Sequence, residues 1–284
     1  MQAIFPDAVD GDLLKLVHLS NGFRMVPGTR PLQVGDVCRA EARIISITNS
    51  DSGKAVKVKG SVLRDGQAVL EVTSSFLYRG RFTDYINTFE IVDAADYAIT
   101  LATEAEIGVL KSKEWFQWDD TSVSLTLGTT LIFKTQSEST YKGKNTFASV
   151  TVTGAAYTKN QLKQLKQVAT IESCVEDAHG NVVLGYLQRH GKVLGEAALF
   201  ETGGYTLTSS EFPAVIDAPL TNEPYSNISG DFNPIHINPY FSDYAALPGT
   251  ITHGMWSSAA TRKYVENVVA RGIPERVLSY VPFP

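Results

Sequence analysis

Three strand-like runs, Val37–Ile47, Ala55–Leu63 and Ala68–Tyr78, follow one another with little chain between them. Within the second run, apolar and polar residues alternate, which is the period of a half-buried strand. Asp65-Gly66 separates the second run from the third, and this dipeptide is a strong signal for a two-residue hairpin. Hairpin-linked strands are antiparallel, so the sequence predicts an antiparallel sheet and excludes a βαβ unit here.

Two segments predict helices beside this sheet. Asp10–Leu19 opens with Asp-Gly-Asp, whose acidic side chains can cap a helix, and continues with apolar residues. Thr250–Ala270 carries an apolar stripe at roughly helical spacing, and the first half of this segment is rich in alanine and serine. A helix with such small side chains suits close packing against a curved sheet. The sequence therefore predicts an α+β fold with a long helix near its C-terminal end.

The composition indicates a folded protein with no nucleic-acid partner. Hydrophobic residues make up 43% of the chain, which suits a substantial core, and the net charge is -5, whereas nucleic-acid-binding chains are usually basic. Cys38 and Cys174 are the only cysteines and form no disulfide framework. No apolar run approaches the roughly 20 residues of a membrane helix, and Met1–Val9 lacks the basic region of a secretory signal. We expect a cytoplasmic protein with no membrane partner.

The segment Tyr225–His236 contains the most informative polar residues. Asp231 and His236 are five residues apart, which would put them about 140° apart around a straight helix. Asn233-Pro234 lies between them, and proline disfavours helical backbone at the preceding residue. We therefore expect a turn that brings both side chains to one point, where a carboxylate beside an imidazole forms a general acid–base pair.

Both residues also have ordinary structural explanations, because aspartate caps turns and a histidine can be a satisfied core residue. The later segment Pro248–Met255 favours chemistry, since it leads into the predicted long helix and puts Gly254 near the first turn. Backbone N–H groups there have no helical partner, and a glycine lets a substrate carbonyl approach closely. A base and such a donor together suit proton removal next to a thioester carbonyl. The alternative for Gly254 is close helix–sheet packing.

The other histidines carry weaker signals. His18, His179 and His190 have no metal-ligand spacing, so we interpret them as structural or surface residues and expect no metal site. His253 directly precedes Gly254 and is a candidate for substrate contact, although packing or hydrogen bonding is the favoured role.

Tyr225–Ser242 resembles the signature of the MaoC-like dehydratases and type-2 enoyl-CoA hydratases. The matching residues are the aromatic Tyr225, then Ile228-Ser229-Gly230-Asp231, Asn233-Pro234-Ile235-His236, and Ser242. Further segments resemble the dehydratase region of the fungal type I fatty acid synthase beta subunit, and they are Asp12–Gly22, Pro31–Asp36, Glu71–Ser75, Tyr78–Gly80, Ser112–Gln117 and Pro248–Met255. This resemblance runs from near residue 3 to near residue 280.

The resemblance implies hot-dog units, each a curved antiparallel sheet wrapped on a long helix. It implies a degenerate N-terminal unit over 1–90, a middle hot-dog-like part over 91–215, and the start of a catalytic MaoC-like unit over 216–284. A catalytic hot-dog unit normally continues with several strands after its helix, and only about fourteen residues follow the helix here. We therefore expect this chain to be part of a longer polypeptide, with an incomplete sheet around that helix.

The resemblance also implies a reaction, the dehydration of (3R)-3-hydroxyacyl-acyl carrier protein to the trans-2-enoyl thioester. Carried over by motif, His236 takes the α proton, Asp231 assists departure of the 3-hydroxyl or orients the group that does, and Gly254 N–H polarises the thioester carbonyl. Asn233, Pro234 and His253 are the expected substrate contacts. The reaction needs no cofactor and no metal. The implied partners are the phosphopantetheine-bearing acyl carrier protein, the other synthase domains and the alpha subunit of a large hetero-oligomer.

Two other interpretations remain open. The reverse reaction would make the protein a stand-alone (3R)-specific enoyl-CoA hydratase, because Asp231 and His236 serve the same equilibrium in either direction. The chain can also be a structural or assembly fragment that is inactive in isolation.

Overall fold

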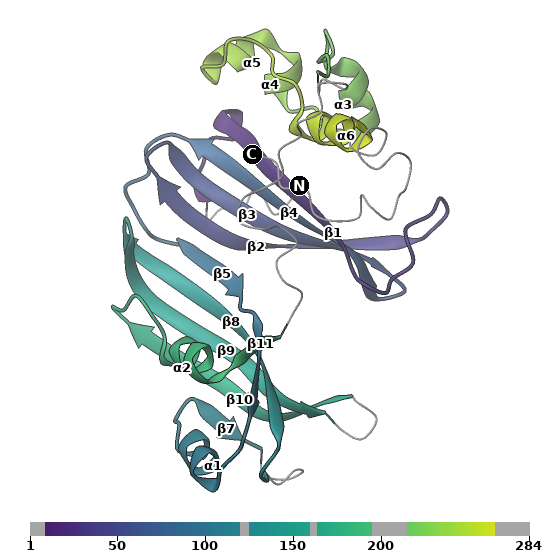
Figure 1. Ribbon diagram of the computed structural model, residues 1–284. Helices are drawn as coiled ribbons and strands as arrows, with labels where there is room; N and C mark the ends of the chain where they lie inside the picture. Colours follow the sequence, from purple (N-terminus) through teal and green to yellow (C-terminus); the bar gives the residue numbers. More distant parts are fainter. Residues whose placement is uncertain (1–8, 120–124, 160–163, 195–214, 265–284) are drawn as a thin grey trace. The chain divides into compact units, whose positions relative to one another are not determined.

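The structure is a computed structural model that describes residues 9–119, 125–159, 164–194 and 215–264. The chain divides into two compact units, one formed by Met1–Phe82 together with Ala198–Pro284, and one formed by Thr83–Ala197 (Figure 1). The division into 1–90, 91–215 and 216–284 expected from the sequence stays a prediction. No helix among the described residues is long and apolar enough to cross a lipid bilayer.

The first unit contains an antiparallel sheet in the order β1-β4-β3-β2. The strands are β1 (Leu16–Met25), β2 (Cys38–Ser50), β3 (Gly53–Arg64) and β4 (Gln67–Arg79). Asp65 and Gly66 join β3 to β4, and their φ angles of 53° and 77° are both positive, as a type I′ hairpin requires. The three predicted strands and their antiparallel pairing are confirmed.

The helix predicted over Asp10–Leu19 is wrong. Only Leu13–Lys15 forms a short 3-10 helix, capped by the Asp12 side chain, and β1 begins at Leu16. β1 pairs with β4 from Leu16 opposite Tyr78 to Met25 opposite Leu70, with one register shift between His18 and Ser20, so the chain gains a long ladder of backbone hydrogen bonds. That tertiary pairing outweighs the local helix signal, and it puts His18 on a strand.

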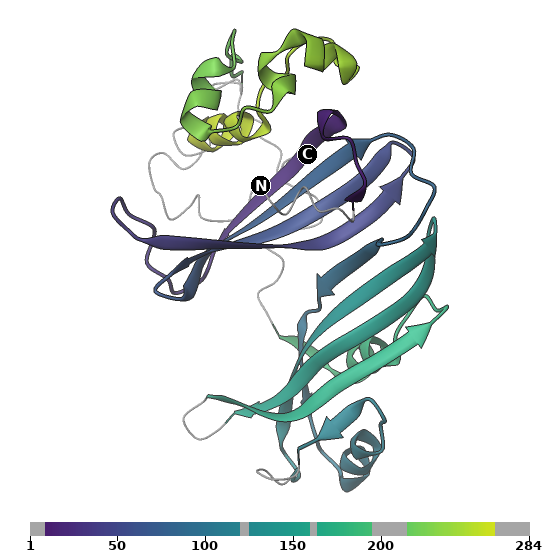
Figure 2. The same ribbon diagram turned by 180° about the vertical axis from the view of Figure 1, so that it is seen from behind.

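The helices of the first unit group on one side of this sheet in both views (Figures 1 and 2). They are α3 (Glu223–Ser229), α4 (Pro234–Ile237), α5 (Pro239–Tyr244) and α6 (Gly254–Tyr264), and α6 contacts β1. The helix predicted over Thr250–Ala270 is confirmed from Gly254 to Tyr264, and its last residues lie outside the described part of the chain. The expected incompleteness of the sheet around α6 also concerns chain outside that part, and it stays a prediction.

The second unit is also antiparallel, with the strand order β5-β8-β9-β10-β7, while β6 pairs with β8 and β11 pairs with β6. Its elements are β5 (Phe89–Asp93), β6 (Asp96–Thr100), α1 (Glu104–Lys111), β7 (Phe116–Trp118), β8 (Thr130–Gly143), β9 (Thr146–Lys159), β10 (Leu165–Glu176), α2 (Val182–His190) and β11 (Lys192–Leu194). Its apolar core includes Phe133, Val152 and Leu187, all fully buried. Both units therefore combine antiparallel strands with short helices, which confirms the α+β prediction.

Candidate active site

The turn between α3 and α4 is built from short-range hydrogen bonds. Gly230 ends α3 with a left-handed φ of 71°, a conformation that glycine adopts at little cost. The Asp231 carboxylate accepts a hydrogen bond from the Asn233 N–H (3.2 Å), and the Asn233 side chain accepts one from the Ile235 N–H (3.4 Å). Pro234 occupies the first helical position of α4, where its missing N–H costs nothing. Asn233 and Pro234 thus form the turn that the sequence predicts.

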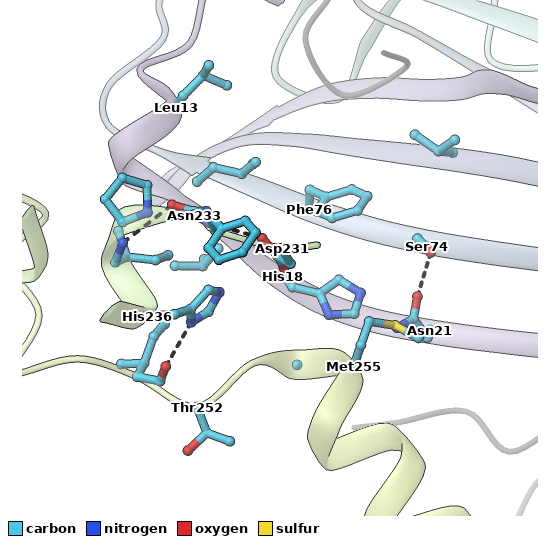
Figure 3. Close-up of a pocket in the computed structure, with 18 of the residues that line it drawn as sticks. Leu13, His18, Asn21, Ser74, Phe76, Asp231, Asn233, His236, Thr252 and Met255 are labelled. Carbon is cyan, nitrogen blue, oxygen red and sulfur yellow. Dashed lines mark hydrogen bonds between the residues drawn. The ribbon is translucent and has the colours of Figure 1, made fainter. Parts of the chain in front are cut away.

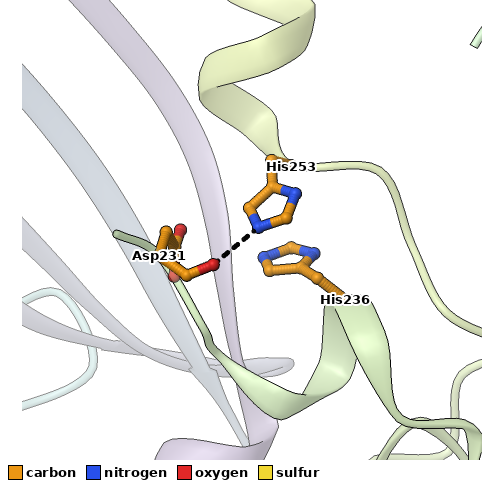
Figure 4. A group of neighbouring side chains, drawn as sticks. All are labelled: Asp231, His236 and His253. Carbon is orange, nitrogen blue, oxygen red and sulfur yellow. Dashed lines mark hydrogen bonds between the residues drawn. The ribbon is translucent and has the colours of Figure 1, made fainter. Parts of the chain in front are cut away.

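α4 presents His236 to this turn as a largely buried residue, 9% exposed. Its Nδ1 lies 2.7 Å from the carbonyl oxygen of Ile251. A carbonyl oxygen only accepts hydrogen bonds, so Nδ1 carries the proton and, in the neutral ring, Nε2 keeps its lone pair. Figure 4 shows this second nitrogen on the side of Asp231.

Burial lowers the pKa of His236 below its usual 6.5. The hydrogen bond to Ile251 opposes this shift by raising the pKa, the neighbouring His253 lowers it further, and the Asp231 carboxylate raises it. The net shift is downward, so the ring is neutral at pH 7. A neutral imidazole with a free Nε2 is a proton acceptor.

The structure brings Asp231 and His236 together, as the turn was expected to do. One carboxylate oxygen of Asp231 and one ring nitrogen each of His236 and His253 lie within 4.8 Å of one another (Figure 4). A metal centre is a poor interpretation of this cluster, because the His253 nitrogen next to Asp231 already holds its proton in a hydrogen bond to a backbone carbonyl. A protonated nitrogen has no lone pair for a metal ion.

His253 has a position that favours support over substrate contact. It is 1% exposed, and its Nε2 donates to the Asp231 carbonyl oxygen (3.0 Å) and lies 3.3 Å from the Ser226 hydroxyl. Its ring stacks on His236, with centroids 3.9 Å apart, and packs against Tyr225 at 4.8 Å. It is not among the residues that line the cavity described below. The predicted substrate contact therefore has no support from its position, whereas the favoured packing role does.

Gly254 begins α6, so its N–H has no partner within the helix. A β-carbon at this position would overlap Nδ1 of His18 and would lie 3.2 Å from His18 Cγ. The glycine therefore allows β1 and the start of α6 to touch, which is the packing alternative. Its N–H can still serve as a donor, so the two roles coexist.

A cavity of about 840 Å³ lies between the sheet of the first unit and the turn (Figure 3). Its lining is mostly apolar. Leu16, Val58 and Val72 contribute from the sheet. The turn and α4 contribute Gly230, Asp231, Phe232, Asn233, Pro234, Ile235 and His236, and the start of α6 with the residues before it contributes Ile251, Thr252, Gly254 and Met255. The predicted site residues Asp231, Asn233, Pro234, His236 and Gly254 all line this cavity.

His18 and Asn21 on β1 also line the cavity, and the sequence analysis did not select them as site residues. The His18 ring packs on Phe76 with centroids 5.1 Å apart, and burial lowers its pKa despite the opposing effect of Asn21. Asn21 is 2% exposed, accepts from Ser74 Oγ (2.5 Å) and has its Nδ2 2.6 Å from Met255 Sδ (Figure 3). The helix expected over Asp10–Leu19 concealed the strand that carries His18, and strand alternation alone would have put residues 18 and 21 on opposite faces.

Two further side chains hold the backbone around His236. The buried Ser242 hydroxyl donates to the Ile235 carbonyl oxygen (2.8 Å). The Asn222 amide donates to the carbonyl oxygens of His236 (2.8 Å) and Ile251 (3.1 Å). Ser242 belongs to the resemblance signature, whereas no sequence pattern singled out Asn222.

Two family models match this chain, one in each of the two compact units. Residues 89–187 match the family model described as "Fatty acid synthase subunit beta, insertion domain", and residues 200–282 match the "MaoC like domain". The chain is 47% identical over 284 residues to fatty acid synthase subunit beta of Schizosaccharomyces pombe. It is 46% identical over 283 residues to the Saccharomyces cerevisiae subunit and 41% over 281 residues to fatty acid synthase beta subunit TOXC of Cochliobolus carbonum.

The chain matches one region of the fungal fatty acid synthase beta subunit. These matches cover 98 to 99% of the chain but only 13 to 14% of each relative's own length. The resemblance inferred from the motifs is confirmed, and so is the MaoC-like hot-dog class of the fold. The MaoC-like match contains Asp231, His236 and Gly254. The insertion-domain match lies inside the second compact unit.

Proposed function

We propose that this part of the beta subunit dehydrates (3R)-3-hydroxyacyl chains carried by acyl carrier protein to trans-2-enoyl thioesters. The observation that supports it most is the state of His236, whose Nδ1 is engaged with the Ile251 carbonyl and whose pKa is lowered. A neutral ring with its Nε2 free next to a carboxylate, at the wall of an apolar cavity, suits a general base.

His236 Nε2 would remove a proton from C2 of the substrate. As that C–H bond breaks, negative charge develops on the thioester oxygen, and the Gly254 N–H at the start of α6 is the proposed donor to it. The C3–O bond then breaks, the C2–C3 double bond forms, and the departing hydroxyl takes up a proton to leave as water. The proton removed from C2 balances the proton that the water gains.

Asp231 would act at C3. Its carboxylate lies within 4.8 Å of the imidazole, so a substrate carbon chain can place C2 near His236 while the 3-hydroxyl donates to Asp231. This contact would orient the hydroxyl for departure. Asn233 and Pro234, which line the same wall, are the proposed flanking contacts.

The rest of the cavity suits an acyl chain, because its walls on the sheet are largely apolar. The larger assembly is supported by the relatives, whose names describe them as beta subunits of fatty acid synthases, whereas the acyl carrier protein follows from the proposed reaction. We propose the acyl carrier protein, the other synthase domains and the alpha subunit as partners.

The test is the dehydration of a (3R)-3-hydroxyacyl thioester, followed by enoyl absorbance, with this chain and with a complete synthase that carries the same residues. Replacing His236 with alanine should reduce the rate by about 10²- to 10⁴-fold, the usual contribution of a general base. His179→Ala is the matched control, because His179 is an exposed histidine of the second unit. Equal rates for His236→Ala and His179→Ala would contradict the mechanism.

A further inference from the structure

Asn222 occupies the N-cap position of α3 but does not cap the helix. Asparagine at this position usually accepts a hydrogen bond from a backbone N–H of the first turn, and here no such bond forms. Its Nδ2 instead donates to two carbonyl oxygens, those of His236 (2.8 Å) and Ile251 (3.1 Å). Both partners can only accept, so the orientation of the Asn222 amide is fixed by chemistry.

The Ile251 carbonyl oxygen therefore accepts two hydrogen bonds, one from Asn222 Nδ2 and one from His236 Nδ1 at 2.7 Å. Asn222 is 7% exposed, so its amide has little water to replace these partners. One side chain thus links the backbone of His236 to the carbonyl that orients the His236 ring. Asn222 itself does not line the cavity, whereas both of its partners, His236 and Ile251, do.

We propose that Asn222 is a positioning residue that keeps His236 in the Nδ1–H form with Nε2 directed at the substrate. The claim that the oriented ring is the catalytic base rests on the proposed function. The orientation itself does not, because it follows from the three hydrogen bonds around Ile251 and His236.

Loss of the Asn222 amide would release the Ile251 carbonyl from one of its two donors. The carbonyl could then turn away from His236 Nδ1, and the proton could move to Nε2, which removes the lone pair from the cavity side. The charged and titratable groups that act on the His236 ring are His253 and Asp231, and neither contacts Asn222 through a hydrogen bond described here. Their influence should therefore persist in Asn222 variants.

The second unit offers a matched control in Asn181. This residue is also at a helix N-cap, is 6% exposed, and donates from Nδ2 to two backbone carbonyl oxygens, those of Val150 (3.0 Å) and Ser173 (3.3 Å). Its loss removes the same number of buried donor bonds, and also the cap bond that Asn181 accepts from the Val183 N–H (2.9 Å), in a unit that does not line the cavity. Asn181→Ala therefore sets an upper limit on the structural cost of losing two such donor bonds.

The test compares Asn222→Ala with Asn181→Ala by two independent measurements. Long-range ¹H–¹⁵N NMR, with His236 assigned by its loss in His236→Ala, reports which ring nitrogen carries the proton. We expect mostly Nδ1–H in the parent and in Asn181→Ala, and a large Nε2–H fraction in Asn222→Ala. The pKa of His236 should also fall, because the bond to Ile251 raises it. In the dehydration assay, kcat should fall on the order of 10- to 100-fold with a smaller change in KM.

Unchanged NMR signals of His236 in Asn222→Ala would overturn the positioning role, whatever the activity. If the tautomer shifts in Asn222→Ala but the parent protein shows no dehydration, the positioning role is supported and the proposed function is refuted. If Asn222→Ala does not fold, the same NMR signals of the His236 ring are measured in Asn222→Ser, which keeps one hydrogen-bond donor. A shift towards Nε2–H would support the positioning role, and unchanged signals would overturn it. An equal fall of kcat in the Asn181 and Asn222 variants at equal loss of stability would also overturn the proposal.

Discussion

Gly254 and His18 form a contact whose energy can be measured with a double-mutant cycle. A β-carbon on Gly254 would overlap His18 Nδ1 and would approach His18 Cγ to 3.2 Å and Cβ to 3.4 Å. His18 cannot move away freely, because its ring packs on Phe76 with centroids 5.1 Å apart. We therefore predict that Gly254→Ala forces a rearrangement of the contact between β1 and α6.

The size of the effect follows from two opposing contributions. Overpacking of this kind costs about 1–3 kcal/mol in unfolding free energy. Alanine in place of glycine stabilises a helix interior by at most about 1 kcal/mol, and less at the first residue of α6. Gly254→Ala should therefore destabilise the first unit by about 1–2 kcal/mol. In a His18→Ala background the overlap disappears, so the same substitution should be neutral or slightly stabilising.

Native-state hydrogen exchange of the β1 amides is the assay, because it reports the opening free energy of the first unit separately from that of the second. The four proteins of the cycle should give a coupling free energy of about 1–3 kcal/mol between positions 18 and 254. A coupling near zero, with Gly254→Ala equally costly in both backgrounds, would refute the argument that His18 fills the space beside Gly254.

Three further predictions concern the same site. Ser242→Ala removes a buried hydroxyl that donates to the Ile235 carbonyl, so the unfolding free energy should fall by about 1–3 kcal/mol in urea titrations. His236 and His18 have pKa values lowered from 6.5 in the folded state, so the unfolded chain binds more protons than the folded chain just below pH 6.5. The unfolding free energy should therefore decrease as pH falls from 7 to 5.5. Replacing both histidines with glutamine should make the unfolding free energy less dependent on pH. Asp231→Asn keeps an oxygen for the turn but removes the charge that raises the pKa of His236, so NMR titration should show that pKa lowered further, and an unchanged value would contradict the assigned electrostatics.

The site turn was predictable from sequence because its determinants are local. The bonds from Asn233 N–H to Asp231 and from Ile235 N–H to Asn233 each span two residues, and Pro234 restricts the backbone beside them. A sequence carries both partners of such bonds side by side. The expectation that Asp231 and His236 share one place therefore needed no knowledge of the rest of the fold.

The segment before β1 shows where local inference failed. The side chain of Asp12 does cap a helix, but that helix spans only Leu13–Lys15, because β4 offers the following residues an antiparallel partner. Calling that segment a helix also hid His18, whose place in the cavity depends on its position on a strand. A local helix propensity is weak compared with a ladder of backbone hydrogen bonds between two long strands.

The sequence by itself determined the hairpin strands of the first unit, the turn that carries Asp231 and His236, and the resemblance to a region of the fungal beta subunit. The tertiary structure decided which nitrogen of His236 is free, since the Ile251 carbonyl is 15 residues away, and which side chains share the cavity, since Asn21 meets Met255 across 234 residues. Hydrogen bonds between near neighbours, such as those of the turn, can be anticipated from residue type and spacing. Contacts between distant residues exist only after the sheet and helices have packed, so only the folded chain reveals them.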